Sequence, residues 1–158
     1  MTGPTRTRAQ IGKSSRRKGA DFERAVANAI RPWFPEAKRS RDNGSTTTTD
    51  TGDIAGTWTG LWWSLKDDKS GAVDRWFDEA ILKARNLVPL VVQKRAGCAN
   101  PLRAWAWVRL SDLGWMVQKV PFAGPELLGW RLVRLEVRTV LDLLADAGHA
   151  RVPLEDTA

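Results

Sequence analysis

Three residues of this chain combine side chains and positions that suit phosphodiester chemistry. Asp53 opens one short apolar segment, and Lys66 ends the next one, which reads Leu-Trp-Trp-Ser-Leu-Lys. An acid at the start of one strand and a lysine at the end of the following strand converge at the same edge of a sheet. Glu23 stands on the border of the apolar stripe of a predicted helix, from where it can face Asp53 across that edge. The sequence therefore predicts a site with two carboxylates and one amine.

Hydrolysis of a phosphodiester is the chemistry that such a site serves. It requires neutralisation of charge at the phosphoryl oxygens and an ionised water in line with the leaving oxygen, and two hard divalent ions held by carboxylates supply both. A nearby lysine orients that water or stabilises the pentacovalent state. Placing Lys66 at the end of so apolar a strand costs desolvation unless a carboxylate lies near, so such a lysine often marks a site. The alternatives are that Lys66 only reaches solvent and that Glu23 is an ordinary solvated helix residue.

The elements that must position these residues follow from the spacing of apolar side chains. Recurrence at three and four residues predicts amphipathic helices over 19–33, ended by Pro35, and over 73–85. The polar run at 41–52 predicts a loop. Further predicted elements are strands at 53–56, 60–66, 88–93 and 102–110, a helix cap at 111–113, a segment of strand or helix at 130–135 and a helix at 137–147.

The order helix, strands, helix, strand, strand predicts an α/β fold with a mixed central sheet flanked by helices. We expect 60–66 to be a central strand that pairs with 53–56 in the manner of a hairpin. The helix at 73–85 is expected to cross over to the strand at 88–93. These connections bring the end of the strand at 60–66 close to Asp53.

Length and composition indicate a single domain, because 158 residues with 42% hydrophobic content are enough for one core and too few for two. The segment 1–18 is basic, almost free of apolar residues and expected to be a disordered arm. The core is expected over 19–120. Residues 121–158 are expected to form a partly helical C-terminal extension with a frayed tail.

The charge balance points to a polyanionic partner. The chain holds 25 Lys and Arg against 18 Asp and Glu, a net charge of +7, and nucleic acid is the obvious partner. A basic surface without a specific partner is the alternative. The single cysteine, Cys98, excludes an internal disulfide framework, and the single His149 cannot support a histidine-based metal site. Neither a membrane span nor a secretion signal is evident, which favours a cytoplasmic location.

Several short motifs occur in the order found in one nuclease family. They are Arg-Lys-Gly-Ala-Asp-Phe-Glu at 17–23, Arg-Ser at 39–40, Gly-Ser-Thr at 44–46, Gly-Asp-Ile-Ala-Gly at 52–56 and the strand that ends at Lys66. Together, over about residues 16–110, they resemble the archaeal and phage Holliday-junction resolvases of the PD-(D/E)xK, or restriction-endonuclease-like, superfamily. The resemblance implies a restriction-endonuclease-like core and a homodimer that cuts branched DNA, such as four-way junctions, with Mg²⁺ or Mn²⁺.

The resemblance also implies roles for particular residues. Glu23 and Asp53 would hold Mg²⁺, Lys66 would serve the hydrolytic water, and Arg39 with the loop at 44–46 would approach DNA phosphates. The chain departs from the family at one position, because Ser64 stands two residues before Lys66, where the family has a glutamate. A neutral hydroxyl is a poor substitute for a carboxylate at a divalent ion.

Three remedies for this departure remain open. Strand alternation puts Trp62, Ser64 and Lys66 on one face, but a register shift would let the triplet Asp-Asp-Lys at 67–69 supply the acid and the lysine. Alternatively, Asp67 or Asp68 bends back toward the site, or the oxygen of Gln93 becomes a ligand. The third reading is a protein that binds DNA and cuts it poorly or not at all.

A phosphate track is expected around this centre. The second predicted helix carries Trp76 and Phe77, for which a core position, stacking on bases and a dimer interface are all open. The competing functions are a DNA-binding module with a decayed site and a nicking or restriction-type endonuclease. The residues expected to contact DNA are Arg16, Arg17, Lys18, Arg39, Arg41, Ser45, Thr46, Lys69, Lys94 and Arg95.

Overall fold

A mixed sheet forms the centre of the molecule in this computed structural model, which describes residues 8–40, 51–118 and 131–153. Within those residues its strands lie in the order β3 (Leu61–Lys66), β4 (Val88–Gln93), β5 (Trp105–Arg109) and β6 (Leu132–Glu136). β3 and β4 are parallel, and the other neighbours are antiparallel. The expected α/β class with a mixed sheet is therefore confirmed.

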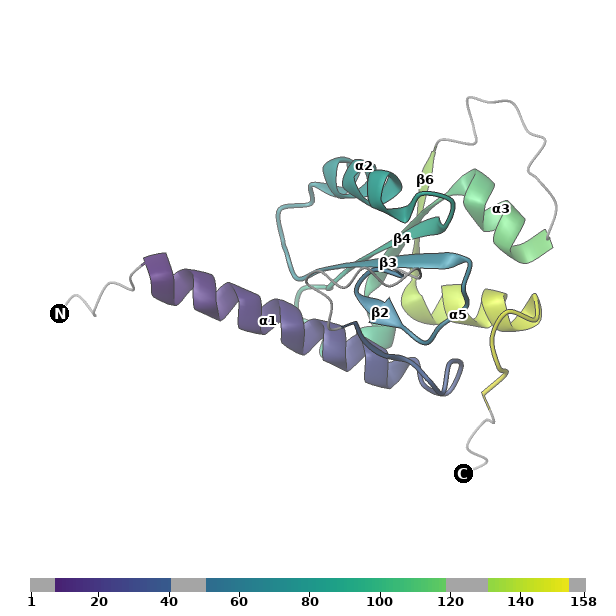
Figure 1. Cartoon of the computed structure of the whole chain (residues 1–158), viewed down its shortest axis with the longest axis horizontal. Coiled ribbons are helices and arrows are strands. Elements are labelled where there is room, and N and C mark those ends of the chain that lie inside the picture. The colour runs from purple at the N-terminus through teal and green to yellow at the C-terminus, as the bar shows by residue number, and fades with distance from the viewer. Residues whose placement is uncertain (1–7, 41–50, 119–130, 154–158) are drawn as a thin grey trace.

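Helices cover both faces of this sheet (Figure 1). One face carries α2 (Val73–Ala84), and the other carries α1 (Arg8–Ala29) and α5 (Val137–Asp146). A 3-10 turn, η1 (Pro101–Arg103), precedes β5, and α3 (Leu110–Gln118) follows it. Because α2 connects β3 to β4 in parallel, the predicted crossover between them is confirmed.

Alternation along β3 divides its side chains between two cores. Trp62 packs with the buried residues of α2, whereas Trp63 and Leu65 pack in the larger core beneath α1 and α5. Both faces of the strand are thus covered, which explains why its sequence is almost continuously apolar. The predicted division of faces, with Ser64 and Lys66 on the side of α2, follows from this arrangement.

The segment that carries Asp53 runs along the outer edge of β3. The backbone N–H of Asp53 donates to the carbonyl of Trp63 (2.8 Å), and the N–H of Trp63 donates to the carbonyl of Thr51 (2.9 Å). The glycine at 52 has a φ of 80° and lies in a parallel bridge with Trp63. A Cβ on Gly52 would stand 2.0 Å from the carbonyl oxygen of Trp63, so glycine is required for this close approach.

The expected hairpin between 53–56 and 60–66 is wrong. β2 (Ile54–Ala55) pairs antiparallel with β1 (Lys38–Arg39) instead, and β3 is an edge strand of the main sheet rather than a central one. Gly56, with a φ of 77°, lies directly against the backbone of Glu36, which turns the chain toward β1. The segment 53–56 therefore pairs with the earlier strand β1 and not with the strand that follows it in sequence.

The first helix is longer than expected at one end and shorter at the other. It begins at Arg8, so residues 8–18 are helical and not a disordered arm, and residues 1–7 lie outside the described part. Low apolar content argues against burial but not against helicity, since each residue added to an existing helix costs little. The helix ends at Ala29 because Pro32 disfavours helical geometry in the preceding residue.

The C-terminal part of the chain belongs to the core and is not an extension of it. β6 pairs with β5 along its whole length, and α5 buries Val140, Leu141 and Leu144 in the main core. The segment left open between strand and helix is thus a strand over 132–136, and the helix predicted at 137–147 is present. The predicted cap at 111–113 lies instead inside the first turn of α3. No helix of the described residues is long and apolar enough to cross a membrane.

Candidate functional site

Asp53 is held in place by the backbone of the neighbouring strand. Its Oδ2 accepts a hydrogen bond from the N–H of Leu65 at 2.6 Å. Burial raises the pKa of the Asp53 carboxyl, and the negative charge of Glu23 raises it further. The Leu65 hydrogen bond and the positive charges of Lys66 and Lys83 oppose that rise. The predicted residues Glu23, Asp53 and Lys66 are therefore brought within electrostatic reach of one another.

Glu23 reaches this place from the C-terminal half of α1. Its carboxylate accepts a hydrogen bond from Nε of Arg39, which is held in β1. The side chain of Glu23 is 18% exposed and that of Arg39 is 38% exposed. Glu23 is therefore not an ordinary solvated helix residue, and Arg39 faces the acidic centre as well as solvent.

Lys66 lies at the open end of β3, on the side of α2. Its Nζ stands 3.9 Å from Oε2 of Glu79, and Lys83, one helical turn after Glu79, acts electrostatically on Asp53. Sequence reasoning missed both helix residues. A signal was present, because Glu79 follows the buried Trp76 by three residues and so borders an apolar stripe, as Glu23 does.

The position where the family has its second acid is closed. Ser64 is only 4% exposed and stands opposite Val91 of β4, beneath α2. Its hydroxyl adds no charge, and the carboxylate that pairs with Lys66 comes from Glu79 of α2 instead.

The other residues considered as replacements for that glutamate form hydrogen bonds and ion pairs with groups outside the Asp53 site. Asp67 pairs with Nζ of Lys94 at 3.0 Å. Asp68 accepts a hydrogen bond from the N–H of Ser70 at 2.7 Å, and hydrogen bonds from Ser70 lower the pKa of the Asp68 carboxyl. Nε2 of Gln93 donates to the backbone carbonyl of Asp68 at 3.1 Å. Asp67, Asp68 and Gln93 thus organise the turn after β3 and do not approach Asp53.

The donor set at the site suits a weakly held, partly hydrated ion. Among the described residues, no three Asp, Glu, His or Cys side chains lie close enough together to form a metal-binding group. Mg²⁺ normally keeps several waters and binds through one or two carboxylates plus substrate phosphates. Glu23 and Asp53 provide two carboxylates whose mutual repulsion a cation would relieve. The pair therefore fits Mg²⁺, with Arg39 as a competing cation on Glu23.

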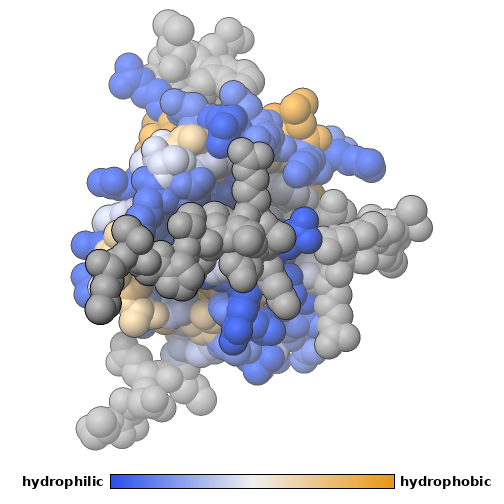
Figure 2. Space-filling view, turned by 90° about the vertical axis from the view of Figure 1, so that its left-hand side faces the viewer, coloured by the Kyte–Doolittle hydropathy of each residue, from blue (hydrophilic) through white to orange (hydrophobic). Residues whose placement is uncertain are grey.

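The basic residues expected to contact DNA fall into different environments. Arg16, Arg17 and Lys18 are exposed on α1, and Lys69 is exposed in the turn after β3. The N-terminal half of α1 projects beyond the sheet (Figure 1), and hydrophilic residues dominate the coloured surface on that side of the molecule (Figure 2). Residues that lie outside the described part are Arg41, Ser45 and Thr46.

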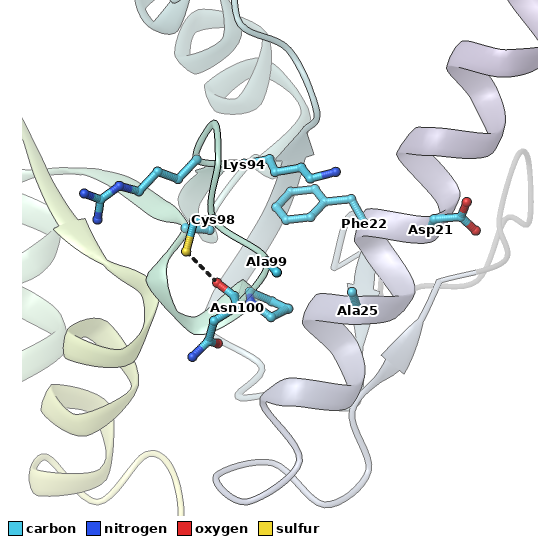
Figure 3. Close-up of a pocket in the computed structure, with 10 residues that line it drawn as sticks. Asp21, Phe22, Ala25, Lys94, Cys98, Ala99 and Asn100 are labelled. Atoms are coloured by element: carbon cyan, nitrogen blue, oxygen red, sulfur yellow. Dashed lines mark hydrogen bonds between the residues drawn. The ribbon is translucent and has the colours of Figure 1, made fainter.

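A hollow of about 280 Å³ separates α1 from the segment after β4. In Figure 3 the ring of Phe22 points into it, and Lys94 extends over that ring with its Nζ 5.7 Å from the centroid. Arg95 also lines the hollow, and Sγ of Cys98 contacts the carbonyl oxygen of Asn100 at 3.7 Å on its far side. The hollow therefore has an apolar wall at Phe22, the residue before Glu23, and two cationic side chains, of which Lys94 pairs with Asp67.

Trp76 and Phe77 do not form a surface. Each is only 3% exposed, and both pack against Trp62 and Val91 on the face of the sheet that α2 covers. Of the roles left open for them, base stacking and a dimer interface are therefore wrong, and the core position is correct.

Comparisons of the chain with protein-family models, with curated proteins and with solved structures give no match.

Proposed function

We propose that this chain is a metal-dependent endonuclease that hydrolyses phosphodiester bonds in DNA. The observation that carries the proposal is the convergence of Glu23, Asp53 and Lys66, from three separate segments, at the outer edge of β3. An acidic pair beside a lysine is the equipment that phosphodiester hydrolysis needs. The element order around it, with a parallel crossover from β3 through α2 to β4, supports a restriction-endonuclease-like core.

Each residue has a separate task in this mechanism. The N–H of Leu65 fixes the Asp53 carboxylate, so that this ligand needs no reorganisation. Lys66 places a positive charge beside the attacked phosphate and the water that attacks it. When bound, Mg²⁺ neutralises the phosphoryl oxygens and lowers the pKa of a water. Arg39 occupies Glu23 in the absence of a cation and can transfer to a DNA phosphate in its presence.

Glu79 does not replace the metal ligand that is missing at Ser64, but it supports the lysine. It pairs with Lys66 and reaches the same face of β3 from the overlying helix. A carboxylate there holds the ammonium group at the mouth of the strand, close to Asp53. We therefore assign Glu79 as a positioning residue for Lys66.

Branched DNA is the substrate we propose, acted on by a homodimer whose two sites cut opposed strands. The net charge of +7 and the exposed cations of α1 support binding to the DNA backbone. The preference for a branch rests on the resemblance to Holliday-junction resolvases. Because Trp76 and Phe77 are buried within the protomer, the dimer must use another surface.

The direct test is cleavage of a labelled four-way junction and a linear duplex, each with Mg²⁺, Mn²⁺ or chelator. The native protein is expected to cut the junction in either metal. Asp53→Asn and Lys66→Ala should abolish cutting and retain binding, whereas Asp78→Asn, an exposed acid one residue from Glu79, should change neither. Absence of cutting on every substrate would refute the proposal that the chain is an enzyme. Sequence-specific cutting of the duplex alone would indicate a restriction-type endonuclease instead of a junction resolvase.

A DNA-binding module with a decayed site is the second candidate. Two observations favour it, namely the burial of Ser64 at the position of the missing acid and the ion pair of Arg39 with Glu23. Such a module would bind junction DNA equally well with and without metal. Asp53→Asn and Lys66→Ala would then leave both binding and the absence of cutting unchanged.

A further inference from the structure

One part of the sheet face beneath α2 is not covered by that helix. α2 packs on β3 and β4, and the next strand, β5, presents Trp105 and Trp107 with both side chains only partly buried. In the sheet register Trp105 stands beside Gln93 and Glu136, and Trp107 stands beside Val91 and Arg134. The two indoles therefore lie on the same face of β5, where Trp107 packs at the edge of the core under α2 with its Nε1 buried.

Guanidinium groups alternate with these indole rings. The guanidinium of Arg134 lies 4.5 Å from the ring centroid of Trp105 and 5.5 Å from that of Trp107. The guanidinium of Arg95 lies 4.5 Å from the ring of Trp105. Arg95, Trp105, Arg134 and Trp107 thus form a continuous ladder, which we call the Trp–Arg ladder.

The ladder carries an excess of positive charge. Among the residues that the structure describes, Glu136 contacts the ladder, and it pairs with Arg95 at 3.3 Å and with Arg103 at 3.7 Å. Arg134 is exposed and adds a further positive charge. Cations interleaved with aromatic rings are typical of surfaces that bind single-stranded nucleic acid, where bases stack on the rings and phosphates contact the cations.

We propose that the Trp–Arg ladder binds an unpaired DNA strand next to the cleavage site. This inference rests on the proposed nuclease function and adds a substrate feature to it, a single-stranded segment beside the cut. Lys66, Gln93 and Trp105 occupy neighbouring positions on adjacent strands, about 4.8 Å apart, so the ladder begins about 10 Å from Lys66. A strand that leaves the site along this row of the sheet meets the ladder directly.

A chain of contacts joins the two places. Asp67 follows Lys66 and pairs with Lys94, and Arg95, the next residue, stacks on Trp105. Both cations also line the hollow beside α1 shown in Figure 3. Lys66, Lys94 and Arg95 therefore place cations along the path from the site to the ladder, where Lys94 is paired with Asp67 and Arg95 with Glu136.

The test measures affinity for a fluorescent twelve-nucleotide oligothymidine and a twelve-base-pair duplex, by anisotropy, in the full-length Asp53→Asn protein with chelator. The double variant Arg95→Ala/Arg134→Ala should lose about tenfold or more in affinity for oligothymidine and clearly less for duplex. Arg75→Ala, an exposed arginine of α2, should change either affinity by less than about twofold. Thermal unfolding of each variant checks that the fold is kept.

Equal losses for Arg75→Ala and the double variant would overturn the proposal, because they would indicate charge alone. Equal losses on oligothymidine and duplex would also overturn it, since contacts with phosphates would then suffice. A change from dimer to monomer in the double variant would assign the surface to a second copy of the chain instead.

Photo-crosslinking locates the strand independently. Oligothymidine with one 5-iodouracil should form adducts at Trp105 or Trp107, identified by mass spectrometry. Adducts confined to Trp115, which is 40% exposed and lies outside the ladder, would contradict the proposal. Because no step of these measurements requires cutting, a protein that binds oligothymidine through the ladder and cleaves nothing would refute the nuclease and keep the ladder.

Discussion

At the scale of single residues, Asp53 shows the cost of building an acidic site in a partly buried place. Burial and the charge of Glu23 raise the pKa of its carboxyl, so the folded chain holds this proton more tightly than the unfolded chain does. Folding therefore binds a proton between the ordinary value of 3.8 and the raised value, and the contribution of Asp53 to stability falls as the pH rises through that window.

The loss of stability on ionisation of Asp53 leads to a first prediction. Asp53→Asn keeps an oxygen that can accept the hydrogen bond from Leu65 but carries no charge, so the variant should unfold at a higher temperature than the native protein at pH 7. The difference should shrink as the pH falls below 3.8, where the native carboxyl is protonated in both states. Calorimetric melting curves at pH 7 and pH 3 measure it. A variant less stable at pH 7 would show that the ionised carboxylate is stabilising.

A second prediction concerns the cation. Mg²⁺ at millimolar concentration should raise the melting temperature of the native protein, because an ion between Glu23 and Asp53 binds the folded state alone. The Asp53→Asn variant should not respond, whereas Asp78→Asn should respond like the native protein. An identical response of all three proteins would place the ion away from this pair.

At the scale of elements, the sequence predicted what continuous or periodic apolar residues determine. β3, α2 and β4 agree with their predicted bounds to within a residue, because each is a short apolar run or stripe bounded by glycine or charge. The convergence of Asp53 with Lys66 was also predicted, since both lie at ends of such segments.

The remaining features depend on contacts distant in sequence, which no local pattern contains. The pairing of β2 with β1 is set by the close approach of Gly56 to Glu36, and the contact of Glu79 with Lys66 depends on how α2 lies over the sheet. The opposite positions of Trp107 and Arg134, likewise, follow from the register of β5 and β6. Residues that meet only through packing were therefore missed, although their types were suitable.

The turn before Asp53 supports a third prediction. Gly52→Ala would place a Cβ 2.0 Å from the carbonyl of Trp63, whereas Gly71→Ala would meet nothing within 4 Å. Both glycines have positive φ, of 80° and 70°, so both variants bear a backbone penalty of roughly 1–2 kcal/mol. The additional destabilisation of Gly52→Ala, measured by urea unfolding, then reports the steric clash alone, and cleavage should fall with it. Equal destabilisation of the two variants would contradict the close approach.

The helix above the site supports a fourth prediction. Glu79→Gln keeps the volume and removes the charge that contacts Lys66, so kcat should fall by about tenfold while the KM for junction DNA changes little. Asp78→Asn on the same helix is the matched control. An unchanged kcat would remove Glu79 from the mechanism.

At the scale of the whole molecule, the net charge of +7 would attract DNA phosphates to the exposed Lys and Arg side chains. A fifth prediction is therefore that DNA affinity falls steeply with salt. Replacing Arg16, Arg17 and Lys18 by alanine should reduce the slope of log affinity against log salt by about 0.9 for each phosphate that the protein no longer neutralises. Titrations at several salt concentrations measure the slope. An unchanged slope would place the DNA away from the N-terminal half of α1.

The length of α1 has a consequence for where the proposed nuclease would cut DNA. Arg16 and Glu23 are seven residues apart in one unbroken helix, which places them on the same side of it, two turns and about 10 Å apart. A helix is stiff over that distance, so a phosphate bound at Arg16 and the bond that the proposed nuclease would break beside Glu23 would keep a fixed separation. The number of helical residues between Arg16 and Glu23, rather than any base sequence, would then set the distance from the bound phosphate to the cut.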